Sequence, residues 1–205
     1  LRLGMMNPTY LKSFSSELTP LLSDSRIYNF VHMPIQSGSE KILALMKRDY
    51  TISVVLEILR NLRENVSDLT FSTDIIVGFP NESDQDFLAT RQLIRQISPS
   101  ILNISRFGTR PFTSASAFKN QIPDRIKKSR SRELAKDFLS ILKGQNEKWL
   151  GHEFRVLIIE KARKKGWISR ASNYLQVILS EGQPGEFKDV KIVETGLTYL
   201  VGEPI

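Results

Sequence analysis

The chain has 205 residues, of which 40% are hydrophobic and 25% are charged. This composition is typical of a folded protein with one domain and room for a small second one. It contains no cysteine, which excludes disulfides, cysteine nucleophiles and iron–sulfur clusters held by its own side chains. The net charge of +7, with most of the positive excess in the second half of the chain, favours a polyanionic partner.

The sequence shows no sign of a membrane segment or a metal site. No apolar stretch approaches the ~20 residues that a membrane span needs, and residues 1–10 do not resemble a signal peptide. We therefore expect a cytoplasmic protein with no membrane partner. His32 and His152 lie far apart, and neither has neighbours at metal-ligand spacing, so we predict no metal site formed by this chain alone.

The first two thirds of the chain alternate short β-branched or aromatic segments with longer amphipathic ones, which predicts βα units around a parallel sheet. Predicted strands are residues 27–33, 69–77 and 100–107, and predicted helices are residues 9–22, 39–46, 51–65 and 83–97. Residues 1–4 resemble the end of an earlier strand. Ser83 is placed to cap the last of these helices, because Asp84 and Asp86 follow in its first turn.

A long helix is predicted over residues 123–150, with Pro123 in its first turn. We expect its basic face to lie in solvent, with Arg125, Lys127, Lys128, Arg130, Arg132 and Lys136. The pattern then changes to short strands separated by glycine-containing turns, at residues 153–160, 166–171, 175–179, 189–194 and 197–201. This pattern predicts a small antiparallel β-barrel. We therefore divide the chain into residues 1–147 and residues 148–205.

Polar side chains follow or lie within the three predicted strands. Gln36 and Ser37 follow the first strand, Asp74 lies within the second and Arg110 follows the third. Because the carboxyl ends of parallel strands meet at one edge, we expect these side chains to share a cavity. A carboxylate inside a barrel needs a partner, so Asp74 either pairs with Arg48 or Arg110 or binds a cofactor. For Gln36 and Ser37 the alternative role is capping the next helix.

Four segments carry motifs of a known family. Residues 31–39 read VHMPIQSGS, residues 46–50 read MKRDY, residues 73–80 read TDIIVGFP and residues 107–113 read FGTRPFT. Their order and spacing resemble the H-x-P-x-Q-S-G-S, M-x-R-x-Y, T-D-x-I-V-G-F-P and F-x-x-R-x-G-T motifs of the radical S-adenosylmethionine (SAM) methylthiotransferases. The opening residues RLGMMNP and the tyrosine-ending motif resemble the archaeal and eukaryotic branch, which modifies N6-threonylcarbamoyladenosine beside the tRNA anticodon. The last third of the chain resembles the TRAM domain of these enzymes.

This resemblance implies the C-terminal half of a partial (β/α)6 TIM-like radical SAM barrel, followed by the TRAM barrel. It implies SAM and two 4Fe–4S clusters as cofactors of the full-length enzyme, tRNA as the substrate, and the missing N-terminal half as a partner. The motif positions assign Gln36, Ser37, Arg48, Asp74 and Arg110 to cofactor binding. The fork of Arg48 suits the methionine carboxylate, and Arg110 lies on the loop that closes over cofactor or substrate.

The sequence also departs from the family pattern. Asn81 stands where the family usually has Gly, Ser83 where it has Thr, and Phe112 where it has Gly. The largest departure is the absence of the cluster-binding C-x-x-x-C-x-x-C motif and of further cysteines. We therefore expect this chain to be part of a longer protein, to be inactive alone and to bind no cofactor by itself.

A basic cluster at a predicted turn of the last third favours RNA binding. The cluster comprises Lys161, Arg163, Lys164 and Lys165, and Arg170 and Tyr174 follow it. Lysines and arginines would contact phosphates, and Tyr174 or Trp167 would stack on an unpaired base. The alternative is a solvated turn with Trp167 in the core.

Two other functions remain open from the sequence. One is a methylthiotransferase that acts on isopentenyladenosine in tRNA or on a ribosomal protein. The other is a non-catalytic RNA-binding protein that kept the radical SAM scaffold. A cluster motif upstream in the reading frame would favour an enzyme, and a start codon directly before Leu1 would favour the RNA-binding protein.

Overall fold

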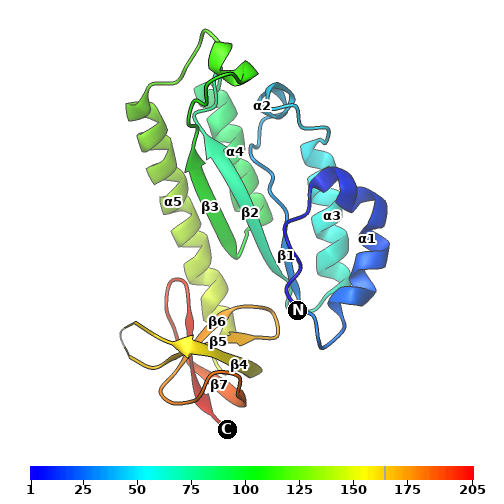
Figure 1. The fold of residues 1–205 in the computed structure, drawn as a ribbon, viewed down its shortest axis with the longest axis vertical. Coiled ribbons are helices and arrows are strands. Elements are labelled where there is room, and N and C mark those ends of the chain that lie inside the picture. Colours follow the sequence, from blue (N-terminus) through cyan, green and yellow to red (C-terminus); the bar gives the residue numbers. More distant parts are fainter. Residues whose placement is uncertain (164) are drawn as a thin grey trace.

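The structure is a computed structural model that describes residues 1–163 and 165–205. A parallel sheet with helices on one face is followed by a closed five-stranded barrel (Figure 1). The sheet has the order β1 (Phe30–His32), β2 (Thr70–Val77), β3 (Ile101–Arg106). Met5 makes an isolated parallel bridge to His32, so the start of the chain runs beside β1.

Helices connect the strands in the manner of βα units. They are α1 (Pro8–Leu22), α2 (Glu40–Leu45), α3 (Ile52–Asn65), α4 (Asp84–Ile97) and α5 (Asp124–Asn146), with short 3₁₀ helices η1 (Ser114–Ala117) and η2 (Glu147–Trp149). Hydroxyl groups of Ser39, Thr51 and Ser83 accept hydrogen bonds from backbone N–H groups in the first turns of α2, α3 and α4. At α4, Ser83 and Asp86 form a complete capping box, which satisfies two otherwise unpaired N–H groups.

The main core lies between the sheet and its helices. Along β2, the side chains of Phe71, Ile75 and Val77 are buried, as the alternation of a strand requires for one face. They belong to one cluster with Leu62 of α3 and Ile94 of α4. The near face of the sheet in Figure 1 is not covered by a helix, so the polar side chains on that face stay accessible.

Ion pairs fasten α5 to α4. Arg91 binds Asp137 through two nitrogens, at 2.6 and 3.1 Å, and Arg95 adds a third bond to the same carboxylate. Further along, the buried Arg130 donates to the buried carboxylate of Glu82 at 2.6 Å. Burial raises the pKa of Glu82 above its usual value. A buried pair of this kind leaves an uncompensated charge if one partner is removed.

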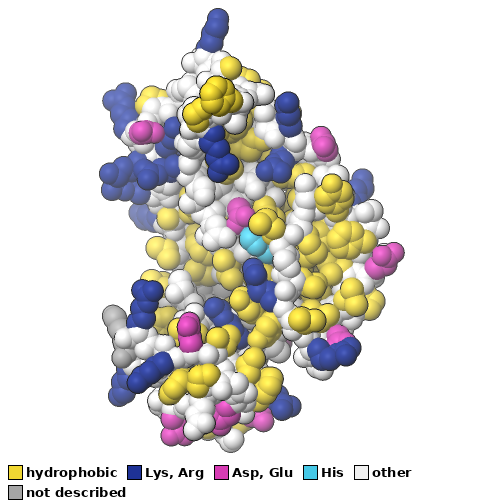
Figure 2. Space-filling model, viewed as in Figure 1, with side chains coloured by type: hydrophobic (Ala, Val, Ile, Leu, Met, Phe, Trp, Pro, Cys, Tyr) yellow, Lys and Arg dark blue, Asp and Glu magenta, His cyan; other side chains and the backbone are white. Residues whose placement is uncertain are grey.

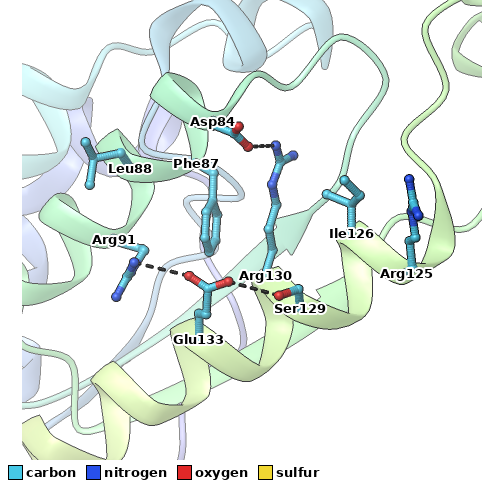
Figure 3. A pocket seen from close by; sticks show the side chains of 9 residues that line it. All are labelled: Asp84, Phe87, Leu88, Arg91, Arg125, Ile126, Ser129, Arg130 and Glu133. Carbon is cyan, nitrogen blue, oxygen red and sulfur yellow. Dashed lines mark hydrogen bonds and ion pairs between the residues drawn. The ribbon is translucent and has the colours of Figure 1, made fainter.

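A groove of about 510 Å³ runs between α4 and α5 on the helical side of the sheet. Figure 3 shows Arg130 directed at Asp84 and Arg91 directed at Glu133, whose carboxylate also accepts from Ser129. These side chains therefore satisfy one another and hold the helices together. The groove contains none of the residues that the sequence motifs assign to a site.

The barrel follows α5 and η2. Its strands are β4 (Glu153–Lys161), β5 (Trp167–Ala171), β6 (Gln176–Leu179), β7 (Phe187–Thr195) and β8 (Leu200–Pro204). They close in the order β4-β5-β6-β8-β7, with β7 back against β4. The pairing of β6 with β8 is parallel, and the other pairings are antiparallel. Val156, Val177 and Val190 are fully buried in its core.

An aromatic side chain joins the barrel to the sheet. The ring of Tyr174, between β5 and β6, lies 5.0 Å from the ring centres of both Tyr28 and Phe30. The Arg170 guanidinium lies 4.5 Å from the centre of the Tyr174 ring on the barrel side. Such aromatic and cation–π contacts stabilise an interface beyond the area that they bury.

Hydrogen bonds add to this junction at two further places. The backbone N–H of Asn29 donates to the carbonyl of Ser172 at 3.0 Å. The buried amide of Asn146, at the end of α5, donates to the carbonyls of Gly196 and Leu197 at 2.9 and 3.0 Å. The barrel is therefore held against the amino-terminal ends of the strands.

The predicted fold class, a partial βα barrel followed by a small β-barrel, is confirmed. Several strand boundaries were wrong, most of all the start of β1 and both ends of β8. β1 begins at Phe30 instead of residue 27, because the N–H groups of Ile27 and Tyr28 bond to loop carbonyls and not to β2. β8 begins at Leu200 instead of residue 197, because a tight turn occupies the residues before it and Gly196 N–H donates to the carbonyl of Tyr199.

The long helix also differs in two respects. Regular α-helix ends at Asn146, and the following residues form the 3₁₀ helix η2. The prediction that its basic side chains all face solvent was wrong for Lys127 and Arg130, which are buried. A Cβ on Gly78 would lie 2.4 Å from Lys127 Cγ, so the Lys127 stem packs on the loop after β2. Long basic side chains can bury their stems in this way.

The Asp137 carboxylate gives the fold a predictable acid response. Hydrogen bonds from Arg91, above all, hold its pKa below the usual value. A depressed native pKa contributes stability above the unfolded pKa of about 4, and this stability is lost as the pH falls through the native value. We expect D137N to lower the free energy of unfolding at neutral pH and to flatten its decline between roughly pH 5 and pH 2.

Urea unfolding followed by circular dichroism across this pH range measures both effects. E133Q is the matched control, because Glu133 is more exposed and lies 3.3 Å from Arg91. It should change the pH dependence less than D137N does. If the free energy of unfolding of D137N declined at low pH just as that of the parent chain does, the lowered pKa of Asp137 would not explain the acid response.

Candidate functional site

The segment after β1 stays hydrogen-bonded to β2 although it is no longer a regular strand. The N–H of Gln36 donates to the carbonyl of Asp74 at 2.8 Å, and the N–H of Ile76 donates to the carbonyl of Gln36 at 2.9 Å. Gln36 has φ of 74°, a conformation that residues other than glycine rarely adopt. The surrounding contacts must therefore hold Gln36 in place beside Asp74.

Two motif side chains provide these contacts. The hydroxyl of Thr73 donates to the carbonyl of Met33 at 2.8 Å and accepts from the N–H of Ile35 at 3.2 Å. The Tyr50 hydroxyl donates to the carbonyl of Ile35 at 2.8 Å. Burial raises the pKa of Tyr50 to about 12, so this hydroxyl remains a neutral donor at physiological pH.

Asp74 has partners that differ from those predicted. Its Oδ1 lies 3.0 Å from His32 Nε2 and accepts from Asn103 Nδ2 at 2.7 Å. The prediction of an ion pair with Arg48 or Arg110 was wrong. Since an ionised carboxylate only accepts hydrogen bonds, His32 Nε2 carries the proton in this contact. The His32 and Asp74 side chains are 13% and 27% exposed, so the carboxylate is oriented but still reachable.

Arg48 lines a hollow of about 540 Å³ together with Met5, Asn7, Pro34 and Gln36. Its Nε is buried and has no hydrogen-bond partner among the described residues. A buried, unpaired nitrogen on a permanently charged guanidinium is costly. The hollow therefore fits an anionic group that would accept from Arg48.

Ser37 does not face this hollow. It is fully buried, its hydroxyl accepts from the N–H of Ser39 at 3.2 Å, and it lies 3.4 Å from the Thr90 hydroxyl of α4. The next residue, Gly38, also contacts α4, since an added Cβ would lie 2.5 Å from Thr90 Cα. Ser37 therefore packs the loop onto α4, and the cap of α2 is Ser39.

Arg110 lies exposed in the loop that follows β3, at the same edge of the sheet. It makes no ion pair with any other described residue. The structure thus brings Gln36 and Arg48 together in one hollow, and the backbone of Gln36 bonds to that of Asp74 beside it. Ser37 and Arg110 stand outside this group. The predicted cavity shared by side chains of all three strands was wrong, because neither Asp74 nor Arg110 is among the residues that line the hollow.

The family departures at Asn81 and Phe112 keep the backbone conformation that glycine would adopt easily. Asn81 has φ of 68° and Phe112 has φ of 64°, both in the left-handed region that favours glycine. Asn81 is held there by Asn120, which accepts its N–H at 3.0 Å and donates to its side-chain oxygen at 2.8 Å. The loop after β2 is therefore tied to the segment that leads into α5.

The predicted RNA-binding residues divide into two groups. Lys161, Arg163 and Lys165 are exposed at the turn between β4 and β5, and Lys164 lies outside the described residues. Arg170 and Tyr174 lie instead in the junction between barrel and sheet. A ring packed between Tyr28 and Phe30 is not free to stack on a base in the way predicted for Tyr174. Trp167 is half-buried against the barrel core.

Sequence reasoning missed four side chains that build the site. His32 was considered as a possible metal ligand and as part of a motif but not as a partner of Asp74, and Asn103 was not considered at all. Strand alternation could have found both, because Asn103 is the register partner of Asp74 in β3. Thr73 and Tyr50 lay within the motifs, but only the three-dimensional contacts show that they bind the backbone of residues 33–35.

The surface supports this location of the site. Figure 2 shows hydrophobic side chains across the middle of the open face, with Lys and Arg gathered along the flank over α5.

In the described part of the chain, none of the helices combines the length and the apolar character needed to cross a membrane. The same residues contain no group of three or more His, Asp or Glu arranged to hold a metal ion.

Comparisons with known proteins agree with this architecture. Residues 5–94 match the model of the Radical SAM superfamily, and residues 147–205 match the TRAM domain. A protein of Pyrococcus horikoshii named a probable threonylcarbamoyladenosine tRNA methylthiotransferase is 40% identical over 205 residues, covering 100% of this chain and 48% of the relative. The human threonylcarbamoyladenosine tRNA methylthiotransferase is 34% identical over 208 residues, covering 100% of this chain and 35% of the relative.

Among solved structures, the coproporphyrinogen III oxidase of Escherichia coli, a radical SAM enzyme, is similar with a TM-score of 0.49 and 13% identity. That similarity covers 100% of this chain and 60% of the oxidase. The chain spans about half the length of the archaeal relatives that it matches. This chain thus combines a match to the Radical SAM superfamily with a TRAM domain, and over its whole length it is similar to proteins named threonylcarbamoyladenosine tRNA methylthiotransferases.

Proposed function

We propose that the protein containing this chain adds a methylthio group to N6-threonylcarbamoyladenosine in tRNA, at carbon 2 of the adenine ring. In this proposal the chain forms one wall of the SAM pocket and a surface that binds tRNA. The observation that carries it is that Gln36 and Arg48 line one hollow and that the backbone of Gln36 bonds to that of Asp74 beside it. The names of relatives from archaea to human support the choice of substrate.

The residues of the hollow would bind the amino-acid end of SAM, and the neighbouring Asp74, which does not line the hollow, would bind its ribose. Arg48 offers an unpaired, buried Nε to the methionine carboxylate, and a guanidinium binds such a group through charge-assisted hydrogen bonds. Asp74, oriented by His32 and Asn103, would accept from ribose hydroxyls. Gln36 would add an amide between the two.

The radical chemistry itself comes from SAM and the two iron–sulfur clusters when they are bound. The chain has no cysteine, so any cluster must be held by residues outside it. The work left to this chain is to bind SAM in one orientation and to exclude water from one side. We propose that the remaining half of the longer relatives covers the open face of the sheet.

The barrel supplies the proposed contact with tRNA. Lys161, Arg163 and Lys165 are exposed at one turn, and the chain carries a net charge of +7. Neutralising phosphates is the main source of affinity for nucleic acids. A tRNA-modifying enzyme acts where tRNA is found, and we propose a cytoplasmic location.

The first test concerns SAM. Because the chain forms only one wall of the pocket, we expect titration calorimetry of residues 1–205 to show SAM affinity weaker than micromolar. Arg48 should still contribute, so R48Q should remove whatever weak heat the parent chain gives. Micromolar binding by the parent chain would contradict the idea that much of the pocket lies elsewhere.

The second test concerns the substrate of the whole protein. We expect disruption of the gene that encodes this chain to remove 2-methylthio-N6-threonylcarbamoyladenosine from tRNA and to leave N6-threonylcarbamoyladenosine in its place. Mass spectrometry of tRNA nucleosides measures both, and complementation with the intact gene should restore the modified nucleoside. Loss of a methylthiolated isopentenyladenosine, or of a modified ribosomal protein, would establish one of the other substrates instead.

The third test concerns the basic turn. We expect K161Q/R163Q/K165Q to weaken tRNA binding and to reduce the slope of log affinity against log salt, by roughly 0.7–0.9 for each phosphate that is no longer neutralised. Fluorescence anisotropy over a series of salt concentrations measures the slope. The control K12Q/R60Q/K119Q removes the same charges from exposed positions outside the barrel. If both triple variants had the same slope of log affinity against log salt, the turn would not be part of the RNA site.

A further inference from the structure

A second cavity lies where the barrel meets the amino-terminal end of the sheet. It has a volume of about 330 Å³, near the lower end of the range for small-molecule pockets. Leu102 of β3 and Phe138 and Leu142 of α5 line one side, and Tyr174 and Tyr199 line the barrel side. This cavity shares no lining residue with the hollow around Arg48.

The cavity combines an apolar lining with a single fixed charge. Arg170 is the one charged residue among those that line it, and no carboxylate is among them. The Arg170 guanidinium lies 4.5 Å from the centre of the Tyr174 ring, and its Nη1 donates to the Tyr174 carbonyl at 3.1 Å. The guanidinium is therefore held in place, and its other N–H groups stay available to an anion.

Uncommitted polar groups lie beside this lining. The side chains of Gln176 and Thr198 line the cavity, and neither makes a hydrogen bond to another described residue. An amide can pair with both a donor and an acceptor on one ligand. Binding pockets at domain junctions commonly combine an apolar lining with a few such polar groups.

We propose that this cavity binds the base of an unpaired RNA nucleotide. Bases of single-stranded RNA are recognised by stacking on aromatic and guanidinium planes and by hydrogen bonds to their edges. Here the planes are those of Tyr199 and Arg170, and Gln176 reads the edge. The proposal rests on the proposed tRNA-binding function and adds to it a site for one base.

The geometry links this cavity to the basic turn. Lys165 lies two residues before the start of β5, and Arg170 lies next to its end, so at about 3.3 Å per residue they are at most roughly 17 Å apart. A short single strand of RNA spans that distance. The base pocket and the phosphate contacts can therefore be used by one loop of RNA, and the absence of carboxylates among the lining residues favours RNA over a basic peptide.

The experiment uses residues 1–205 and a fluorescein-labelled RNA hairpin with an unpaired loop. Q176L removes the amide and keeps the size of the side chain, and T198W fills the cavity from an exposed position. We expect each to weaken hairpin binding by roughly 5- to 100-fold without changing the salt slope, since no charge is lost. Q183L, at an exposed position of the same barrel, is the matched control and should bind as the parent chain does.

A second hairpin carries 2-aminopurine in its loop and reports on the environment of one base. Its emission should change on binding to the parent chain, and Q176L and T198W should abolish that change. If Q176L and T198W both bound the hairpins with the affinity and the emission change of the parent chain, the cavity would not bind a base. That outcome would point to a polypeptide as its occupant. The RNA-binding function would survive that outcome if K161Q/R163Q/K165Q still weakened binding, whereas failure of the parent chain to bind either hairpin would refute both.

Discussion

The site depends on keeping the backbone after β1 attached to β2 once regular strand pairing has ended. Thr73 and Tyr50 bind the backbone of residues 33–35 from two sides, and Gln36 then exchanges backbone hydrogen bonds with both neighbours of Ile75. A residue with φ of 74° would otherwise relax to a commoner conformation. Because these bonds hold it, Gln36, Asp74 and Arg48 share one edge of the sheet.

Asp74 shows how a carboxylate can be oriented without being neutralised. Its partners are an imidazole and an amide, and neither carries the permanent charge of an arginine. An Asp74–Arg48 pair would have used both groups, leaving no free cation and no free acceptor. The observed arrangement keeps the guanidinium of Arg48 and the carboxylate of Asp74 as separate binding groups. This separation suits a zwitterionic ligand that carries its own carboxylate and hydroxyl groups.

Much of the fold and part of the site could be predicted from the sequence. Periodicity located the helices of the first part closely, because α3 and α4 have strong amphipathic patterns and hydroxyl caps. It missed the limits of β1 and β8, which are set by loop hydrogen bonds that leave no pattern. The motif around Gln36 and Asp74 was identified, but the burial of Ser37 against Thr90 depends on contacts between residues 53 positions apart.

The same reasoning explains the errors in the basic residues. A run of lysines and arginines on a helix predicts a solvated face, and only tertiary contacts reveal that Arg130 reaches the buried Glu82. Arg170 and Tyr174 likewise read as an exposed pair, while the fold places Tyr174 against Tyr28 and Phe30 and Arg170 over the Tyr174 ring. Local sequence carries no signal for a contact between two domains.

The packing of Tyr174 fixes the distance between the barrel and the Asp74 edge of the sheet. With that ring seated on Phe30 and Asn146 bonded to the turn before β8, the barrel cannot swing freely about the end of α5. Phe30 and Gln36 are six residues apart, which corresponds to at most about 20 Å of chain. If RNA binds the barrel as we propose, stacked nucleotides that rise by about 3.4 Å each would reach the Asp74 edge after at most roughly six of them. The packing of Tyr174 would thus fix the position of bound RNA relative to the Asp74 edge. A smaller side chain at position 174 would make that position less precise before it lowered the affinity for RNA.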